Sequence, residues 1–86
     1  MKGVAVVTGA AGGIGLAIVE LLLKESVSVL AVDRDAGNLA KAARLGAEVL
    51  VADLAEPAAR DQVVSKAAGA RYLVNAAGIT HLAPIR

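Results

Sequence analysis

The 86-residue sequence contains no cysteine, phenylalanine or tryptophan, and only one histidine and one tyrosine. Without cysteine, disulfides and thiolate metal sites are excluded. A single histidine cannot form a histidine cluster, so we expect no metal site. With so few aromatic side chains, the core must consist of Ala, Val and Leu, which bury less area per residue. We therefore expect one small domain, residues 1–86, of low stability.

Charge of neither sign is concentrated along the chain. Nine basic and eight acidic residues give a net charge of +1, and their scatter argues against nucleic acid or an anionic membrane as a partner. Glu20 and Lys24 interrupt the most apolar stretch, so no run is long enough to span a membrane. The first residues already form a strand-like run that leaves no room for a signal peptide. We expect a cytoplasmic protein.

A glycine-rich segment lies between an apolar run and a helix-like run. Residues 8–15 read Thr-Gly-Ala-Ala-Gly-Gly-Ile-Gly, preceded by Val4–Val7 and followed by Leu16–Lys24. A strand, a glycine-rich turn and a helix start form the arrangement that binds the pyrophosphate of a dinucleotide. Gly9 suits a tight turn with a positive φ, and Gly13 lacks the Cβ that would keep a phosphate away from the backbone. We therefore predict a dinucleotide site here.

The spacing of the glycines distinguishes this motif from related ones. Ile18 stands where the general Rossmann fingerprint has a glycine, and no Gly-Lys-Ser/Thr follows as a P-loop requires. The remaining pattern, Thr-Gly-x-x-x-Gly-Ile-Gly, resembles the short-chain dehydrogenase/reductase family. The alternative is a turn whose glycines serve packing alone. The resemblance implies cofactor contacts at Gly9, Gly12, Gly13, Ile14 and Gly15.

Four apolar runs alternate with three helical windows. The expected strands, which we interpret as buried because polar residues hardly alternate in them, are Gly3–Thr8, Val27–Asp33, Glu48–Asp53 and Arg71–Asn75. The expected helices are Ile14–Lys24, a second from the N-cap Asp35 to Gly46, and a third from Pro57 to Gly69. This βαβαβαβ order predicts an α/β, Rossmann-like parallel sheet with strand order 3-2-1-4.

An acidic residue closes the second strand, at the edge where such a sheet binds its ligand. Asp33 follows Gly15 by 18 residues, where a carboxylate reaches the two adenosine ribose hydroxyls. Its charge would repel a 2′-phosphate, which favours NAD over NADP. Arg34 is expected against the adenine, although an Arg can also pair with a 2′-phosphate. The alternative role of Asp33 is to cap the turn before the second helix.

The ends of the third and fourth strands carry two more motifs of the family. Asp53-Leu54 is similar to its Asp-hydrophobic pair, which implies contacts with the adenine. The segment that begins at Asn75 is similar to its Asn-Ala-Ala-Gly segment, which implies cofactor contacts at Asn75, Ala76 and Gly78. Two alternatives stay open, because Asp53 can serve as a strand-end cap and Asn75 can have a purely structural role.

The catalytic residues of the family have no match in residues 1–86. The family uses a Ser and a Tyr followed four positions later by Lys, whereas Ala76 follows Tyr72 at that spacing. We therefore expect no catalytic residue and a truncated member of the family, the cofactor-binding portion of an NAD-dependent oxidoreductase. One alternative is that the Ser-Tyr-Lys half comes from another chain or has been lost. The other is a self-assembling apolar fragment without useful cofactor binding.

The fourth strand is expected at an edge of the sheet. The first two helices are expected to cover one face of the sheet, whereas only the third helix covers the other, so part of that face stays bare. An open apolar edge recruits another strand, and burying the bare face recovers about 25 cal/mol per Å². We therefore expect a homodimer or a higher homo-oligomer that uses Tyr72–Val74 and the uncovered face.

Overall fold

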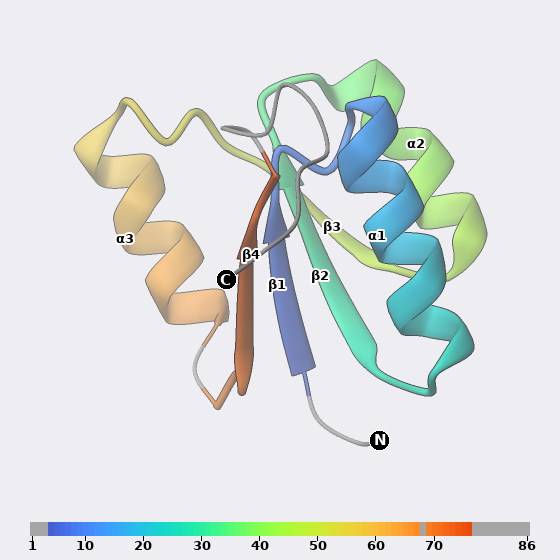
Figure 1. Ribbon diagram of the computed structural model, residues 1–86. Coiled ribbons are helices and arrows are strands. Elements are labelled where there is room, and N and C mark those ends of the chain that lie inside the picture. Colours follow the sequence, from blue (N-terminus) through green and yellow to red (C-terminus); the bar gives the residue numbers. More distant parts are fainter. Residues whose placement is uncertain (1–3, 68, 77–86) are drawn as a thin grey trace, which may run out of the picture.

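The computed structural model describes residues 4–67 and 69–76, which form a four-stranded sheet and three helices (Figure 1). The elements are β1 (Val4–Thr8), α1 (Gly13–Lys24), β2 (Ser28–Asp33), α2 (Ala36–Leu45), β3 (Glu48–Val51), α3 (Pro57–Lys66) and β4 (Tyr72–Asn75). The strands are parallel and lie in the order β3-β2-β1-β4. The predicted fold class and strand order are confirmed.

The strand register brings the carboxyl ends of all four strands to one edge. Thr8 of β1 lies opposite Val32 on one side and Asn75 on the other. Asp33, the last residue of β2, lies opposite Val51 of β3. The strand order reverses between β1 and β4, which is the point where open α/β sheets bind ligands.

Local signals in the sequence account for the helix boundaries. Asp35 caps α2 as predicted, because its Oδ1 accepts from the backbone N–H of Asn38 at 3.0 Å. Gly46 ends α2 in the left-handed conformation, with φ of 110°. Pro57 opens α3, where a missing N–H costs no helical hydrogen bond. After α1 the left-handed position falls on Ser26, with φ of 63°.

Two predicted boundaries differ from the structure by more than one residue. The third helix ends at Lys66 rather than Gly69, because Gly69 takes a φ of 85° and lies in the turn toward β4. The third strand ends at Val51 rather than Asp53, because its partner β2 ends opposite Val51. Both differences shorten an element by the residues that form the following turn.

The prediction that all four strands are buried is wrong for the two edge strands. Four residues each of β1 and β2 are buried, whereas β3 and β4 contain no fully buried residue. An edge strand has a neighbouring strand on one side only, so more of its surface stays exposed than that of a central strand. Leu73 of β4 is consequently 74% exposed.

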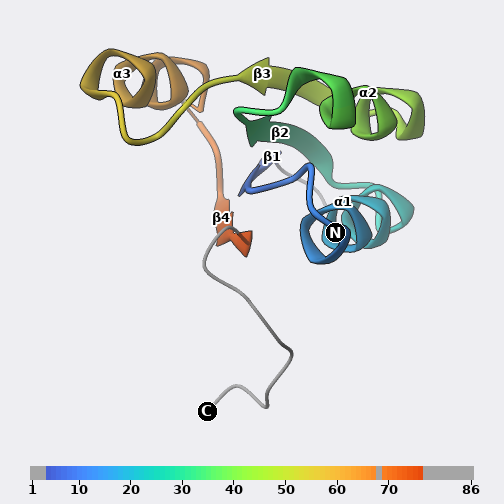
Figure 2. The ribbon, with the colours of Figure 1, turned by 90° about the horizontal axis from the view of Figure 1, so that it is seen from above.

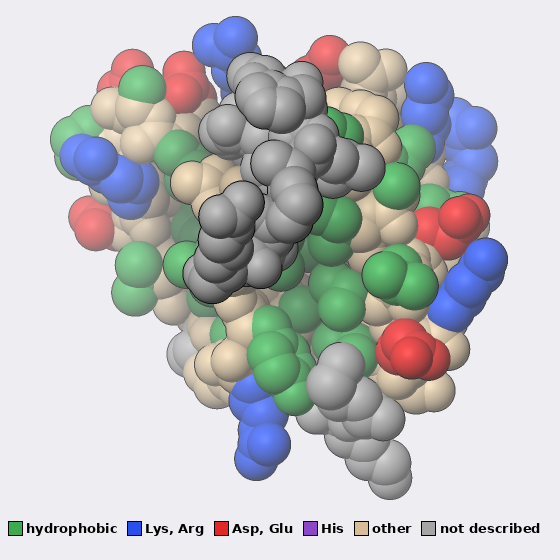
Figure 3. All heavy atoms as spheres, viewed as in Figure 1, with side chains coloured by type: hydrophobic (Ala, Val, Ile, Leu, Met, Phe, Trp, Pro, Cys, Tyr) green, Lys and Arg blue, Asp and Glu red, His purple; other side chains and the backbone are tan. Residues whose placement is uncertain are grey.

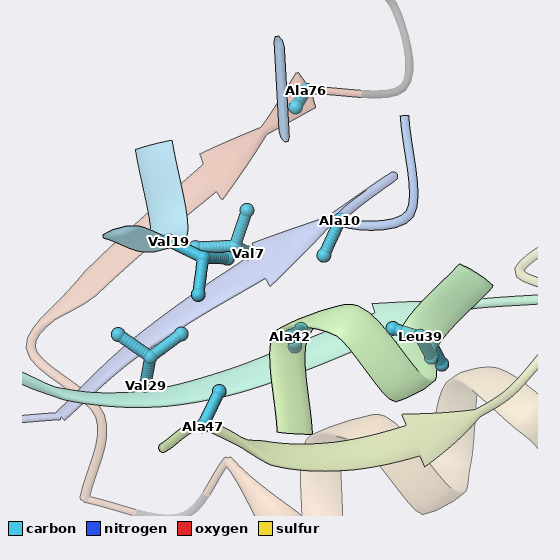
Figure 4. Packing of buried hydrophobic residues seen from close by; sticks show 9 residues of the cluster. Val7, Ala10, Val19, Val29, Leu39, Ala42, Ala47 and Ala76 are labelled. Carbon is cyan, nitrogen blue, oxygen red and sulfur yellow. The ribbon is translucent and has the colours of Figure 1, made fainter. Parts of the chain in front are cut away.

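The sheet separates two hydrophobic clusters. Helices α1 and α2 cover one face and α3 lies on the other (Figure 2). The cluster under α1 and α2 contains Val7, Ala10, Val19, Val29, Ala31, Leu39, Ala42, Ala47 and Ala76 (Figure 4). The cluster on the α3 side contains Val6, Leu30, Val32 and Ala52. No residue of α3 itself is fully buried.

The longest helix, α1, has 12 residues. Within residues 4–67 and 69–76, no helix has the length and apolar character needed to cross a membrane.

Candidate functional site

The glycine-rich turn leaves β1 and folds against the end of β2 before α1 begins. Gly9 has a φ of 70°, the positive value predicted from its place in the motif. The N–H of Ala10 donates to the Val32 carbonyl at 3.2 Å. The next amide, of Ala11, donates to Oδ2 of Asp33 at 3.0 Å. Two consecutive hydrogen bonds therefore attach the turn to β2.

Two glycines of the turn have very different surroundings. A Cβ on Gly15 would collide with the Gly9 carbonyl oxygen and lie 2.8 Å from the Cα of Ala10. The helix can approach the turn at this point only because Gly15 has no side chain. A Cβ on Gly13 would meet no atom within 4 Å. Gly15 thus serves close packing, whereas Gly13 borders open space that a ligand can enter.

The start of α1 offers hydrogen-bond donors to that space. The first helical bond runs from the Leu16 N–H to the Gly12 carbonyl at 2.8 Å. The amides of Gly13, Ile14 and Gly15 precede it and have no acceptor within the helix. The N-cap, Gly12, has no side chain that could bind them. Free amides and the partial positive charge of a helix N-terminus together suit an anionic group such as a pyrophosphate.

Asp33 already binds two backbone amides. Its Oδ2 accepts from Ala11, and its Oδ1 accepts from the N–H of Asp35 at 3.0 Å. Asp33 therefore does cap the turn before α2, which is the alternative role that the sequence left open. This role is compatible with a ribose contact, because a carboxylate offers about four acceptor positions and two stay free. These positions can accept hydrogen bonds from ligand hydroxyls.

Asp53 and Asn75 also have local hydrogen-bond partners. Oδ1 of Asp53 accepts from the N–H of Ala55 at 2.9 Å, which is the strand-end cap left open by the sequence. The buried hydroxyl of Thr8 donates to Oδ1 of Asn75 at 3.1 Å and links β1 to β4. The sequence alone did not single out the Thr8 hydroxyl. The predicted strand order, which places Thr8 beside Asn75, is the signal that could have found it.

These elements surround an open cavity of about 520 Å³ at the carboxyl edge of the sheet, the top of Figure 1. Ten of the predicted site residues line it, namely Gly9, Gly12, Gly13, Ile14, Gly15, Asp33, Arg34, Asp53, Leu54 and Ala76. Asn75 is not part of this lining, and Gly78 lies outside the described residues. Sequence reasoning missed Val32, Ala52 and Ala55, which lie within two residues of a predicted Asp.

The strand order and the glycine-rich turn define an α/β domain of the Rossmann class. The family described as short chain dehydrogenase matches residues 3–86, and the chain belongs to this family. It is 42% identical over 91 residues to the D-threitol dehydrogenase of Mycolicibacterium smegmatis. The match covers 94% of this chain and 35% of that enzyme. The chain therefore spans about a third of the length of this relative.

Two solved structures with bound cofactors share the fold. One is 3-ketoacyl-(acyl-carrier-protein) reductase from Brucella melitensis complexed with NADH, with a TM-score of 0.71 and 31% identity over 76% of this chain and 28% of that one. The other is L-sorbose reductase from Gluconobacter frateurii complexed with NADPH and L-sorbose, with a TM-score of 0.66 and 40% identity over 77% of this chain and 28% of that one. One holds NADH and the other NADPH, so the choice between the cofactors must be argued from this chain's own residues.

Proposed function

We propose that this chain binds NAD through its adenosine and pyrophosphate parts. The observation that carries the proposal is one cavity that combines the open space at Gly13 with the carboxylate of Asp33. The pyrophosphate would accept hydrogen bonds from the free amides at the start of α1. The two ribose hydroxyls would donate to the free acceptor positions of Asp33. The adenine would lie beside Asp53 and Leu54, which line the same cavity.

Asp33 is the basis for proposing NAD rather than NADP. A 2′-phosphate would replace a hydroxyl that donates to this carboxylate with a negative group that the carboxylate repels. Arg34 is exposed and lines the cavity next to Asp33. An Arg can stabilise a 2′-phosphate, so the preference depends on the acidic side chain being present.

The membership in the family supports a role in oxidoreduction. We propose that the chain forms the cofactor-binding part of an NAD-dependent oxidoreductase, in which NAD supplies the hydride acceptor. General acid–base help contributes typically 10² to 10⁴ in rate, and the family's Ser, Tyr and Lys have no counterpart in these 86 residues. We therefore expect no turnover of alcohols or ketones by this chain alone. A cytoplasmic location stays a prediction from the sequence.

Calorimetric titration with NAD, NADP and ADP-ribose tests the proposal. We expect NAD to bind about tenfold more tightly than NADP, in the range of a hydrogen bond to a charged group. ADP-ribose should bind almost as well as NAD, because the proposed contacts lie on the adenosine and pyrophosphate side. Tighter binding of NADP would refute the role of Asp33. Absence of binding by all three ligands would refute the function.

Asp33→Ser, with Arg34 kept, should narrow or reverse the preference for NAD. Asp61→Ser is the matched control, because Asp61 lies exposed on α3, lines no part of the cavity and carries the same charge. The control should keep the preference of the wild type. An equal change in both variants would mean that net charge, rather than a contact with Asp33, sets the preference.

We also propose that the chain forms a homodimer or a higher homo-oligomer through the edge of β4. The support is the exposure of Leu73, at 74% of its surface, on a strand that has a partner on one side within the described sheet.

A further inference from the structure

Asp33 connects three parts of the chain at the carboxyl edge of the sheet. Its side chain accepts from Ala11 in the glycine-rich turn and from Asp35 at the start of α2, both at 3.0 Å. Its backbone carbonyl accepts from the N–H of Ala52, just after β3, at 2.9 Å. The residue proposed to bind the ribose is therefore also attached to the turn proposed to bind the pyrophosphate.

The glycine-rich turn has few hydrogen bonds of its own. The bond from the Gly12 N–H to the Gly9 carbonyl is 3.4 Å long, beyond the usual range for an N–H donor. The turn contains glycines, which have more conformational freedom than other residues. Ala10 is attached to the backbone of β2, and the next amide, of Ala11, is attached to the carboxylate of Asp33. Within the described residues, the hydrogen bond to this side chain is the last that attaches the turn to β2 before α1 begins.

We propose that Asp33 is a positioning residue for the phosphate-binding turn as well as a ribose contact. Its carboxylate fixes Ala11 before a ligand arrives, and so holds Gly12 and the free amides at the start of α1 in a defined place. Pre-ordering of this kind reduces the entropy lost on binding. The identity of the ligand rests on the proposed function, whereas the ordering of the turn is a property of the protein without ligand.

Hydrogen exchange of the cofactor-free protein tests this ordering directly. Asp33→Ser should raise the exchange rate of the Ala11 amide about three- to tenfold, the range expected for the net effect of one hydrogen bond. Asp53→Ser is the matched control, since it removes the same charge at the same edge and its carboxylate accepts from Ala55 rather than from the turn. The control should leave the Ala11 amide unchanged.

The buried amide of Leu30 in β2 serves as an internal reference. If Asp33→Ser raises the exchange of Leu30 as well, the fold as a whole is weakened, and the exchange rate of Ala11 is compared with that of Leu30. The inference predicts that the exchange of Ala11 accelerates more than that of Leu30. An equal acceleration at both residues would overturn it.

Binding of ADP and of 2′,3′-dideoxy-ADP separates the positioning role from the ribose contact. The dideoxy compound has the diphosphate but no ribose hydroxyls, so a residue that only binds the ribose has no effect on it. Loss of a negative charge would even favour the diphosphate. The inference instead predicts that Asp33→Ser weakens binding of dideoxy-ADP about threefold or more.

Equal or tighter binding of dideoxy-ADP by Asp33→Ser would overturn the positioning role in binding. If the wild type binds neither nucleotide, the proposed function fails, while the exchange rates of Ala11 still decide whether Asp33 orders the turn. The two failures are therefore distinguishable.

Discussion

The two faces of the sheet are packed very differently. Under α1 and α2, nine buried residues form one cluster, whereas the α3 side has four. On that thinner side Val64 is 71% exposed and Leu73 is 74% exposed. Figure 3 shows hydrophobic side chains along the middle of the molecule in this view, with charged side chains around the margins. The protein is therefore well packed on one face and incompletely covered on the other.

The candidate cavity lies across this division. Its glycine-rich turn packs on the larger cluster, to which Ala10 and Ala76 belong. The part expected to hold the adenine lies on the smaller cluster, through Ala52 and the half-buried Leu54. Packing thus supports the pyrophosphate part of the site more firmly than the adenine part. We expect the main affinity for a dinucleotide to come from the firmly packed part.

The largest difference should appear when each face loses a core side chain. Leu39, a buried residue of α2, packs in the larger cluster, and Val63 of α3 packs in part against the smaller one. Leu39→Ala should lower the free energy of unfolding by about 2–5 kcal/mol. Val63→Ala should lower it by about 1 kcal/mol, because Val63 is only half-buried. Urea denaturation measures both, and equal losses would contradict the difference between the faces.

Gly15 tests the close contact between α1 and the glycine-rich turn. An added Cβ would collide with the Gly9 carbonyl, so Gly15→Ala should cost about 1–3 kcal/mol of stability as α1 shifts away. Thermal unfolding followed by circular dichroism provides the measurement. A variant as stable as the wild type would show that the helix does not depend on this contact.

The face of the sheet on the α3 side, which is incompletely covered, should control self-association. We expect the wild type to sediment as a dimer or larger species at a few tens of micromolar, and Leu73→Lys to weaken association at least about tenfold, which is about 1.4 kcal/mol. Leu21→Lys is the matched control, because Leu21 is 62% exposed on α1 at the other face. Val74, the next residue of β4, is less suitable for this substitution, because it packs against the larger cluster and a lysine there would also disturb the core. A monomeric wild type would contradict the proposed oligomer.

The smallest effect concerns the turn between α1 and β2. Ser26 has a φ of 63°, a conformation that costs a residue with a Cβ about 1 kcal/mol. Ser26→Gly should therefore raise the melting temperature by a few degrees. The gain is limited because glycine also has more freedom in the unfolded chain. An unchanged or lower melting temperature would show that the strain at Ser26 does not exceed the entropy cost of glycine.

Much of the fold could be predicted because its signals are local. The cap at Asp35, the stop at Gly46 and the start at Pro57 each depend on the chemistry of one residue and its near neighbours. The strand order followed from right-handed crossovers between apolar runs. The exposure of β3 and β4 could not be read from their composition, because Val and Leu occupy edge and central strands alike. Edge position depends on which strands have neighbours.

The candidate site was predictable in position but not in its hydrogen bonds. The glycine spacing and the acidic strand ends identified most of the cavity lining. The bond from Ala11 to Asp33 depends on how the turn lies against β2, which a sequence pattern does not specify. The partner of Asn75, the hydroxyl of Thr8, likewise depends on the pairing of β1 with β4. These hydrogen bonds therefore depend on the tertiary arrangement of the strands and the turn, which the local sequence does not specify.

The central claim is that the open space at Gly13 receives the pyrophosphate of NAD, and calorimetric titration of Gly13→Ala with NAD tests it most directly. An added Cβ would meet no protein atom within 4 Å, and alanine favours a helix over glycine by up to about 1 kcal/mol. The variant should therefore be at least as stable as the wild type. We predict that it binds NAD about tenfold more weakly, because the methyl group occupies the space of a phosphate. A stable variant that binds NAD as tightly as the wild type would contradict the account.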